Sequence, residues 1–169
     1  WGGGGQDDVS GAGAYTHMTM LAQSTAGMHN LFRLSSLASI EGFYFKPRID
    51  KQQLDAHREG ICALSACLSG EPSRFLKEGD VAAAVKAAGE YRDILGRDNY
   101  FLEIQDHGIP EQRKIIPGLL QLAEEFNLKV ICTNDVHYVR NADAGPHDAM
   151  LCIQTGDELA NPKRFRFEN

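Results

Sequence analysis

The sequence predicts an α/β fold in which parallel strands alternate with amphipathic helices. Short apolar runs are separated by stretches whose apolar residues recur every three or four positions. The last run, Lys129–Thr133, is β-branched and almost continuously apolar, as in a parallel strand covered on both faces. This alternation is typical of right-handed βαβ units, whose sheet is either open or closed into a barrel. Four such runs are too few to close a barrel.

Four segments are predicted as strands, and two well-marked helices follow the second and third of them. Asp80 is a suitable N-cap for the first helix and Gly96 a suitable end. We place the start of the second helix at Pro117, because an interior proline costs about 3 kcal/mol whereas the first turn accepts it. The predicted strands are His17–Leu21, Gly60–Ser65, Tyr100–Gln105 and Lys129–Thr133.

Composition indicates one globular domain without an obvious nucleic-acid surface. The 169 residues are 43% hydrophobic and 24% charged, with a formal net charge of −6. A module that binds nucleic acid chiefly through phosphates is usually basic, so charge gives no support for DNA binding here. The small basic groups, Lys46 with Arg48 and residues 163–166, are interpreted as solvated surface.

The chain carries no sign of secretion or membrane insertion, and we expect a cytoplasmic protein. Residues 1–14 form a Gly-rich lead, predicted to be flexible, without the features of a signal peptide. No apolar run approaches the roughly 18 residues that a membrane span needs. The four cysteines show no CxxC pair and are expected to be reduced, with Cys62 and Cys132 in the core. Trp1 is not a natural start, so we expect the chain to be cut from a longer protein.

Metal-ligand residue types follow three of the predicted strands. Asp135 and His137 come after the last strand, Asp106 and His107 after the third, and Cys67 after the second. In parallel α/β folds the carboxyl ends of the strands gather at one edge, where chemistry is found. Carboxylate, imidazole and thiolate groups are ordinary ligands of zinc or manganese. The convergence predicts a site for divalent metal ions at this edge.

A plainer interpretation exists for each of these residues. Asp135 could cap the next helix, His137 could be a surface histidine, and Cys67 could be a buried structural thiol. His17 opens its predicted strand, so it lies at the wrong end for a parallel-strand site. His147, at the start of the last helix, is interpreted as a local capping residue.

Several motifs make a family resemblance specific. The stretches "EGICALSACLSGE", "NYFLEIQDHGIPEQRK", "ICTNDVHYV" and "HDAMLCIQTGDELANPKRFRF" resemble the PHP (polymerase and histidinol phosphatase) domain of bacterial DNA polymerase III alpha subunits. Together with the earlier stretch "HMTMLAQSTAGMHNLFRLSSLASIEGFYFKPRID", they occur in the order of that family and cover nearly all of residues 15–169. The pair "TNDVHY" and "LCIQTG" is diagnostic, and "FYFKPRID" is not expected in a free-standing PHP phosphatase. Residues 15–169 are thus expected to be the C-terminal part of such a domain.

The resemblance implies a distorted PHP-type β/α barrel with up to three metal ions at the carboxyl ends of its strands. It implies ligand roles for His17, Cys67, Asp135 and His137. Of these, His17 is assigned by resemblance alone. Asp106 and His107 would either contact the metal ligands or face the substrate, and they are the predicted catalytic residues. The early family motifs, an HxH, an Asp-His and a Glu, are absent and are expected upstream of Trp1.

Two functional interpretations remain open, and a third is less favoured. A complete metal site would catalyse phosphodiester hydrolysis, resembling 3′→5′ exonuclease activity within a replicative DNA polymerase, a nucleotidyltransferase. The alternative is a metal-stabilised docking module for a separate proofreading exonuclease subunit. The third is a stand-alone PHP phosphatase. Under the first two, the partners are DNA and other replisome subunits, reached through the parent polymerase, and residues 1–169 alone are expected to be inactive.

Overall fold

The computed structural model describes residues 15–167, and its strands form one four-stranded sheet in the order β1-β2-β3-β4. Each strand lies within two residues of its predicted position, whereas the predicted flexible lead over residues 1–14 falls outside the described residues. The strands are β1 (Thr19–Ala22), β2 (Ile61–Leu64), β3 (Tyr100–Ile104) and β4 (Lys129–Cys132).

Three of the four strands are parallel, as predicted, but β1 runs antiparallel to β2. In the β1–β2 register Thr19 lies opposite Leu64 and Ala22 opposite Ile61, whereas β2, β3 and β4 pair in parallel. An apolar run shows that a segment is a strand but carries no information about its direction. The consequence is geometric: the beginning of β1 lies beside the carboxyl end of β2.

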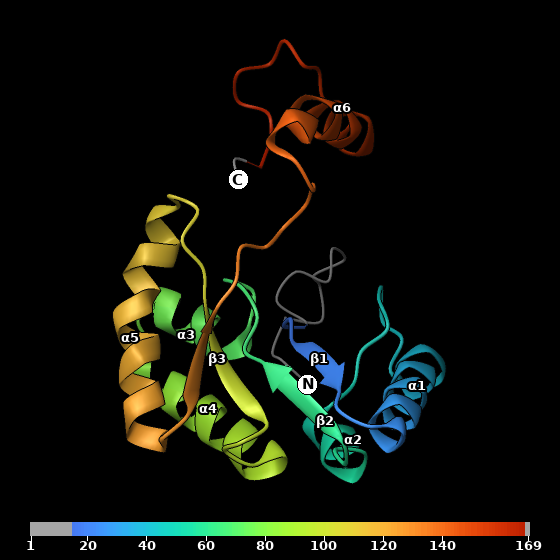
Figure 1. Cartoon of the computed structure of the whole chain (residues 1–169), viewed down its shortest axis with the longest axis vertical. Helices are drawn as coiled ribbons and strands as arrows, with labels where there is room; N and C mark the ends of the chain where they lie inside the picture. Colours follow the sequence, from blue (N-terminus) through green and yellow to red (C-terminus); the bar gives the residue numbers. More distant parts are fainter. Residues whose placement is uncertain (1–14, 168–169) are drawn as a thin grey trace.

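The helices cover the sheet and connect its strands (Figure 1). Helix α4 confirms the predicted caps, because the Asp80 carboxylate accepts the Ala83 N–H at 2.9 Å and Gly96 ends the helix with a φ of 81°. The helices are α1 (Thr25–Ile40), α2 (Lys51–Ala56), α3 (Glu71–Glu78), α4 (Val81–Leu95), α5 (Pro110–Phe126) and α6 (Ala144–Thr155), with a short 3₁₀ helix η1 (Asn141–Asp143) before α6.

Helix α5 begins seven residues earlier than predicted, so the placement of Pro117 in its first turn was wrong. Pro110 occupies the first helical position and Pro117 lies in the interior. Ile115 and Gln112, both upstream of Pro117, are buried, and Ile115 belongs to the main hydrophobic core. Burial of this first half offsets the hydrogen bond that an interior proline removes.

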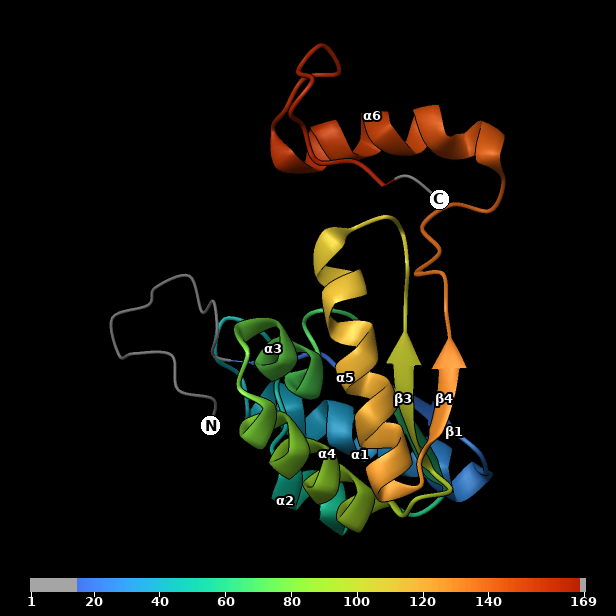
Figure 2. The same ribbon diagram turned by 90° about the vertical axis from the view of Figure 1, so that its left-hand side faces the viewer.

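One hydrophobic core joins the helices to β2 and β3. Helices α4 and α5 pack against the sheet, α3 packs on both of them, and α1 packs against β1 and β2 (Figure 2). Small residues on α4 allow this close approach, since Ala84 and Ala88 are fully buried. The largest fully buried side chains of the core are Tyr100, Leu34, Ile61, Leu102, Leu119 and Leu122.

The edge strand β4 does not fit the prediction of a strand covered on both faces. All four of its residues are exposed, including Val130 and Ile131, which are 38% and 39% exposed. Cys132 is therefore exposed, and its predicted core position was wrong, whereas Cys62 on β2 is buried as predicted. The reason is that α5 packs along only part of β4 and no described strand pairs with its outer edge.

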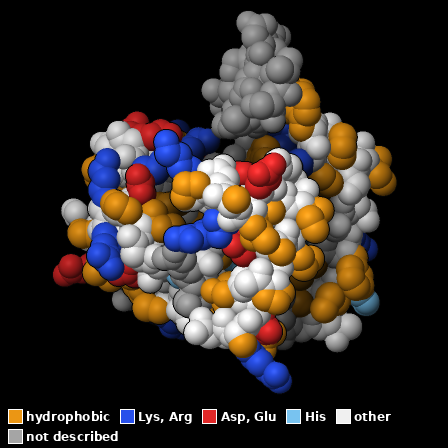
Figure 3. All heavy atoms as spheres, turned by 90° about the horizontal axis from the view of Figure 1, so that it is seen from above, with side chains coloured by type: hydrophobic (Ala, Val, Ile, Leu, Met, Phe, Trp, Pro, Cys, Tyr) orange, Lys and Arg blue, Asp and Glu red, His pale blue; other side chains and the backbone are white. Residues whose placement is uncertain are grey.

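Helix α6 stands apart from the sheet at the end of an extended segment that follows β4 (Figures 1 and 2). It packs chiefly against η1, and the C-terminal loop is held to it by an ion pair between Arg164 Nη2 and Asp148 Oδ2 at 2.6 Å. Apolar side chains remain exposed on this end of the molecule (Figure 3); on α6, Met150 is 69% and Ile153 84% exposed. Within residues 15–167, no helix has both the length and the apolar character required to cross a membrane.

A glycine contact between α1 and the start of β2 gives a stability prediction. A Cβ at Gly27 would lie 1.8 Å from the Gly60 carbonyl oxygen, which is backbone and cannot move aside. We expect Gly27→Ala to lower the melting temperature by about 5 °C or more, the effect of an overpacking cost of roughly 1–3 kcal/mol. Gly145→Ala is the matched control, because nothing lies within 4 Å of that position. Equal melting temperatures for the two variants would contradict the close approach.

Candidate functional site

A large cleft lies where the carboxyl ends of β2, β3 and β4 meet the beginning of β1. Its volume is about 1070 Å³. Residues 15–20 and 46–52 form part of its wall. The rest comes from Leu54 of α2, Glu103 of β3, helices α3 and α4, and groups that follow the three parallel strands. The position is the one that parallel α/β folds use for chemistry.

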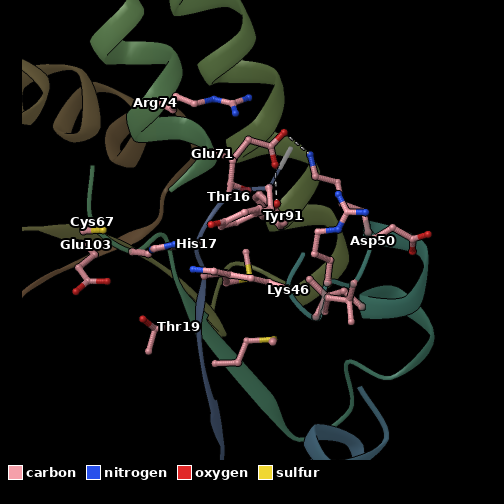
Figure 4. Close-up of a pocket in the computed structure, with 18 of the residues that line it drawn as sticks. Thr16, His17, Thr19, Lys46, Asp50, Cys67, Glu71, Arg74, Tyr91 and Glu103 are labelled. Carbon is pink, nitrogen blue, oxygen red and sulfur yellow. Dashed lines mark hydrogen bonds and ion pairs between the residues drawn. The ribbon is translucent and has the colours of Figure 1, made fainter. Parts of the chain in front are cut away.

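His17 and Cys67 line this cleft together, although the parallel-strand argument had excluded His17. Because β1 is antiparallel, its beginning reaches the carboxyl end of β2, and the His17 N–H donates to the Ser69 carbonyl oxygen at 2.9 Å. Cys67 is a partly buried free thiol that follows Ala66, whose φ of 63° is unusual for a non-glycine residue. Figure 4 shows both side chains at the same end of the cleft.

Asp135 also lines the cleft, whereas His137 does not. Asp135 has a left-handed backbone with a φ of 45°, which turns the chain just beyond β4. The His137 ring instead stacks on Phe167 with centroids 3.5 Å apart, and its Nδ1 donates to the Asp135 carbonyl oxygen at 2.5 Å. The centre of the His147 ring lies 5.8 Å from the centre of the His137 ring. Thus the structure brings three of the four predicted ligands to one cleft and places His137 in an aromatic group beside α6.

Asp106 and His107 hold loops together and do not line the cleft. The Asp106 carboxylate accepts the Gly108 N–H at 2.9 Å and pairs with Arg113 Nε at 3.1 Å. These bonds, that from Gly108 first, hold the pKa of the Asp106 carboxyl below its usual range. His107 Nε2 donates to the Asn134 carbonyl oxygen at 2.7 Å, and its Nδ1 accepts from Gln112 Nε2 at 3.0 Å. Both ring nitrogens are thereby engaged.

Glu103 is a cleft residue that the sequence analysis missed. It lies on β3 and is only 7% exposed. One carboxylate oxygen, Oε1, accepts from Thr133 Oγ1 and from Gln105 Nε2, the latter at 3.1 Å. The other oxygen, Oε2, is buried and has no hydrogen-bond partner within the described part of the chain. A charged residue inside the apolar run "YFLEIQ" was the available signal, because buried carboxylates are rare unless they are paired or functional.

The opposite wall of the cleft is a connected polar network. Lys51 Nζ lies 2.9 Å from Glu71 Oε1 and 2.6 Å from Glu90 Oε2, which ties α2 to α3 and α4. The buried Tyr91 hydroxyl donates to Glu71 Oε2 at 2.6 Å. Burial, together with this bond to Glu71, raises the pKa of Tyr91 well above its usual value. Tyr91 is therefore neutral at physiological pH and acts as a donor.

The donor set of the cleft suits a divalent metal in chemical type. His17, Cys67 and Asp135 supply an imidazole, a thiol and a carboxylate, which zinc and manganese accept. The buried oxygen of Glu103 adds an acceptor to the same wall. Within residues 15–167, however, no three histidine, cysteine or acidic side chains come close enough to hold one ion. The described residues thus place metal-type donors in one cleft without bringing them together around a single ion.

Comparison with known proteins gives consistent results. A family model described as "PHP domain" matches residues 5–107. The chain is 50% identical over 161 residues to a DNA polymerase III subunit alpha from Saccharopolyspora erythraea, covering 95% of the chain and 14% of that protein. It is 46% identical over 163 residues to the same subunit from Mycobacterium tuberculosis, covering 96% of the chain and 14% of that protein. It is 44% identical over 155 residues to the Thermus aquaticus subunit, covering 92% of the chain and 13% of that protein.

The contacts of Asp106 lead to a prediction about pH. A carboxyl group whose folded pKa is depressed stabilises the fold above its unfolded pKa of about 3.9, and this stability is lost as the pH falls through the folded pKa. We expect Asp106→Asn to lower the melting temperature at pH 7, with a difference from wild type that shrinks toward pH 3. Thermal melts of both proteins at several pH values measure this.

Asp98→Asn serves as the control for this pH series, because the Asp98 carboxylate is 71% exposed and its ion pairs are 3.3 and 3.9 Å long. It should change the melting temperature little at any pH. If the difference in melting temperature between wild type and Asp106→Asn grew toward low pH, the stabilising role of the Asp106 carboxylate would be contradicted.

Proposed function

This chain belongs to the PHP domain family, and from that premise we propose that it is part of a bacterial DNA polymerase III alpha subunit acting in DNA replication. The chain spans 14% of the length of the S. erythraea and M. tuberculosis relatives. We therefore attribute polymerase activity, and the contacts with DNA and the other replisome subunits, to the rest of such a protein. The ordering of the motifs over nearly the whole chain supports this assignment.

We further propose that the cleft is a divalent-metal site for phosphodiester hydrolysis of the 3′→5′ exonuclease type. The observation that carries the proposal is that His17, Cys67 and Asp135 come from three separate segments and line one cleft. Their mixed nitrogen, sulfur and oxygen donors favour zinc or manganese over magnesium. A bound ion would activate water near neutral pH and offset charge on the phosphoryl oxygens.

The protein residues would provide positioning around such an ion. His17 is held by its backbone bond to Ser69, and Asp135 by the turn after β4. We propose that the remaining ligands come from the early motifs of the family and from His137, whose ring would leave Phe167. Asp106 and His107 are assigned to supporting the loops after β3 and β4. Their predicted catalytic role stays a prediction.

The enzyme and docking interpretations differ in what loss of a ligand does. In a docking module the metal is structural, so losing a ligand lowers the stability of the domain because binding energy is then folding energy. In a hydrolytic site an open coordination position is needed, and losing a ligand lowers activity first. We favour the hydrolytic site, because the cleft is large and lined by polar groups on both walls.

His17→Ala in the full-length protein tests the proposed activity. We expect metal-supplemented degradation of a 3′-labelled single-stranded primer to fall at least about tenfold, while the melting temperature changes little. His29→Ala is the matched control, because His29 is exposed on α1 and does not line the cleft. A lower melting temperature without any nuclease activity in the wild type would favour the docking module. No effect of His17→Ala on either quantity would refute both interpretations.

His137→Ala tests the more distant ligand. If the ring leaves Phe167 to complete the site, zinc affinity should fall about 10- to 100-fold, as for other losses in a metal site. Competition with a zinc indicator measures the affinity. An unchanged affinity would remove His137 from the ligand set and leave it as a packing residue of the α6 region.

A further inference from the structure

Lys46 was interpreted from sequence as a solvated surface residue, but it lines the cleft. Figure 4 shows its side chain extending into the cleft with the ammonium end directed toward His17. Tyr15 links the two residues: its ring is stacked on His17 with centroids 6.0 Å apart, and Lys46 Nζ lies 5.5 Å from the centre of the same ring. The positive charge is therefore held on the side of the cleft that carries the metal-type donors.

The backbone around Lys46 is held in an unusual conformation. Phe45, directly before it, has a φ of 60°, which is rare for a bulky residue. The Tyr44 N–H donates to the Lys46 carbonyl oxygen at 3.1 Å, and Pro47 follows. This strained turn fixes the direction in which the lysine side chain leaves the 46–52 segment.

Lys46 differs in its neighbours from Lys51 and Arg48, two other cations that line the cleft. Lys51 is neutralised by Glu71 and Glu90. The Arg48 guanidinium lies 4.7 Å from the centre of the Tyr44 ring, and its Nε donates to the Gly42 carbonyl oxygen at 3.4 Å. By contrast, no carboxylate of residues 15–167 lies within ion-pair distance of Lys46 Nζ. Among the residues that the structure describes, therefore, no carboxylate neutralises its charge.

We propose that Lys46 is a positioning residue that binds a phosphate oxygen of a nucleic-acid strand in this cleft. The inference deepens the proposed hydrolytic function and rests on it for the identity of the strand. A lysine ammonium is a point charge suited to phosphate oxygens. The formal net charge of the chain is −6, so a polyanion needs a local positive charge where it enters the cleft.

The first experiment is residue-specific acylation of lysines in the full-length protein, read by mass spectrometry. Single-stranded oligothymidine is the probe, and inorganic phosphate is the second arm. At ten times the dissociation constant of the oligonucleotide, Lys46 should react roughly tenfold more slowly. Lys77 is the internal control, because it is exposed on α3 and does not line the cleft. Protection by inorganic phosphate as well supports a phosphate contact, whereas equal reaction of Lys46 with and without oligonucleotide overturns the proposal.

The second experiment separates positioning from structural effects. Lys46→Gln should raise the KM for single-stranded DNA about tenfold, the effect of losing one charge-assisted bond. It should leave zinc affinity and the melting temperature unchanged. Lys46→Arg should restore most of the KM, and Lys77→Gln should match wild type. An unchanged KM in Lys46→Gln would overturn the role.

The same measurements distinguish this proposal from the proposed function. If the protein has no nuclease activity but Lys46 is still protected by oligothymidine, the hydrolytic function fails and the phosphate contact stands. If His17→Ala abolishes the nuclease while Lys46 of the wild type is not protected and Lys46→Gln leaves KM unchanged, the function stands and the contact fails.

Discussion

The antiparallel pairing of β1 with β2 is the constraint on which the cleft depends. It returns the beginning of β1 to the carboxyl edge of β2, where the His17 N–H reaches the Ser69 carbonyl oxygen. With a parallel β1, His17 and Tyr15 would lie at the opposite end of the sheet. The 46–52 segment completes the same wall, with Lys46 beside the Tyr15 ring. One strand direction thus decides whether an imidazole and an ammonium face the ends of the parallel strands.

A second set of contacts couples the loops after β3 and β4. Glu103 on β3 accepts from Thr133 just after β4, and Gln105 donates to both residues. Further along, His107 bonds the Asn134 carbonyl oxygen while Gln112 of α5 holds the other ring nitrogen. Glu103 Oε2 and Gln105 Oε1 have no hydrogen-bond partner within residues 15–167, so this buried network is only partly satisfied. It fixes the turn that presents Asp135 to the cleft and explains why polar residues follow apolar strands here.

The sequence predicted the parts of the fold that depend on local hydrophobic periodicity and on residues that cap or end helices. The strands, the Asp80 cap and the Gly96 stop follow from such signals. The carboxyl ends of the three parallel strands lie at one edge of the sheet, but Asp106 and His107 after β3 do not line the cleft. Strand direction is a tertiary property, so the apolar run at residues 17–21 could not show at which edge of the sheet His17 lies. The start of α5 was missed because core packing of Ile115 outweighs the local penalty at Pro117. Similarly, the stacking of His137 on Phe167 joins residues thirty positions apart and leaves no local signature.

The exposed outer edge of β4 has a consequence for the behaviour of the molecule in solution. Its backbone donors and acceptors on that side meet no described strand, and its apolar side chains Val130 and Ile131 are partly open to water. Edges of this kind are templates for adding another strand. Lys129 at the start of β4 is the charge within the strand that opposes such growth. Handled as an isolated polypeptide at high concentration, these 169 residues would therefore tend toward edge-to-edge association, limited mainly by their net negative charge.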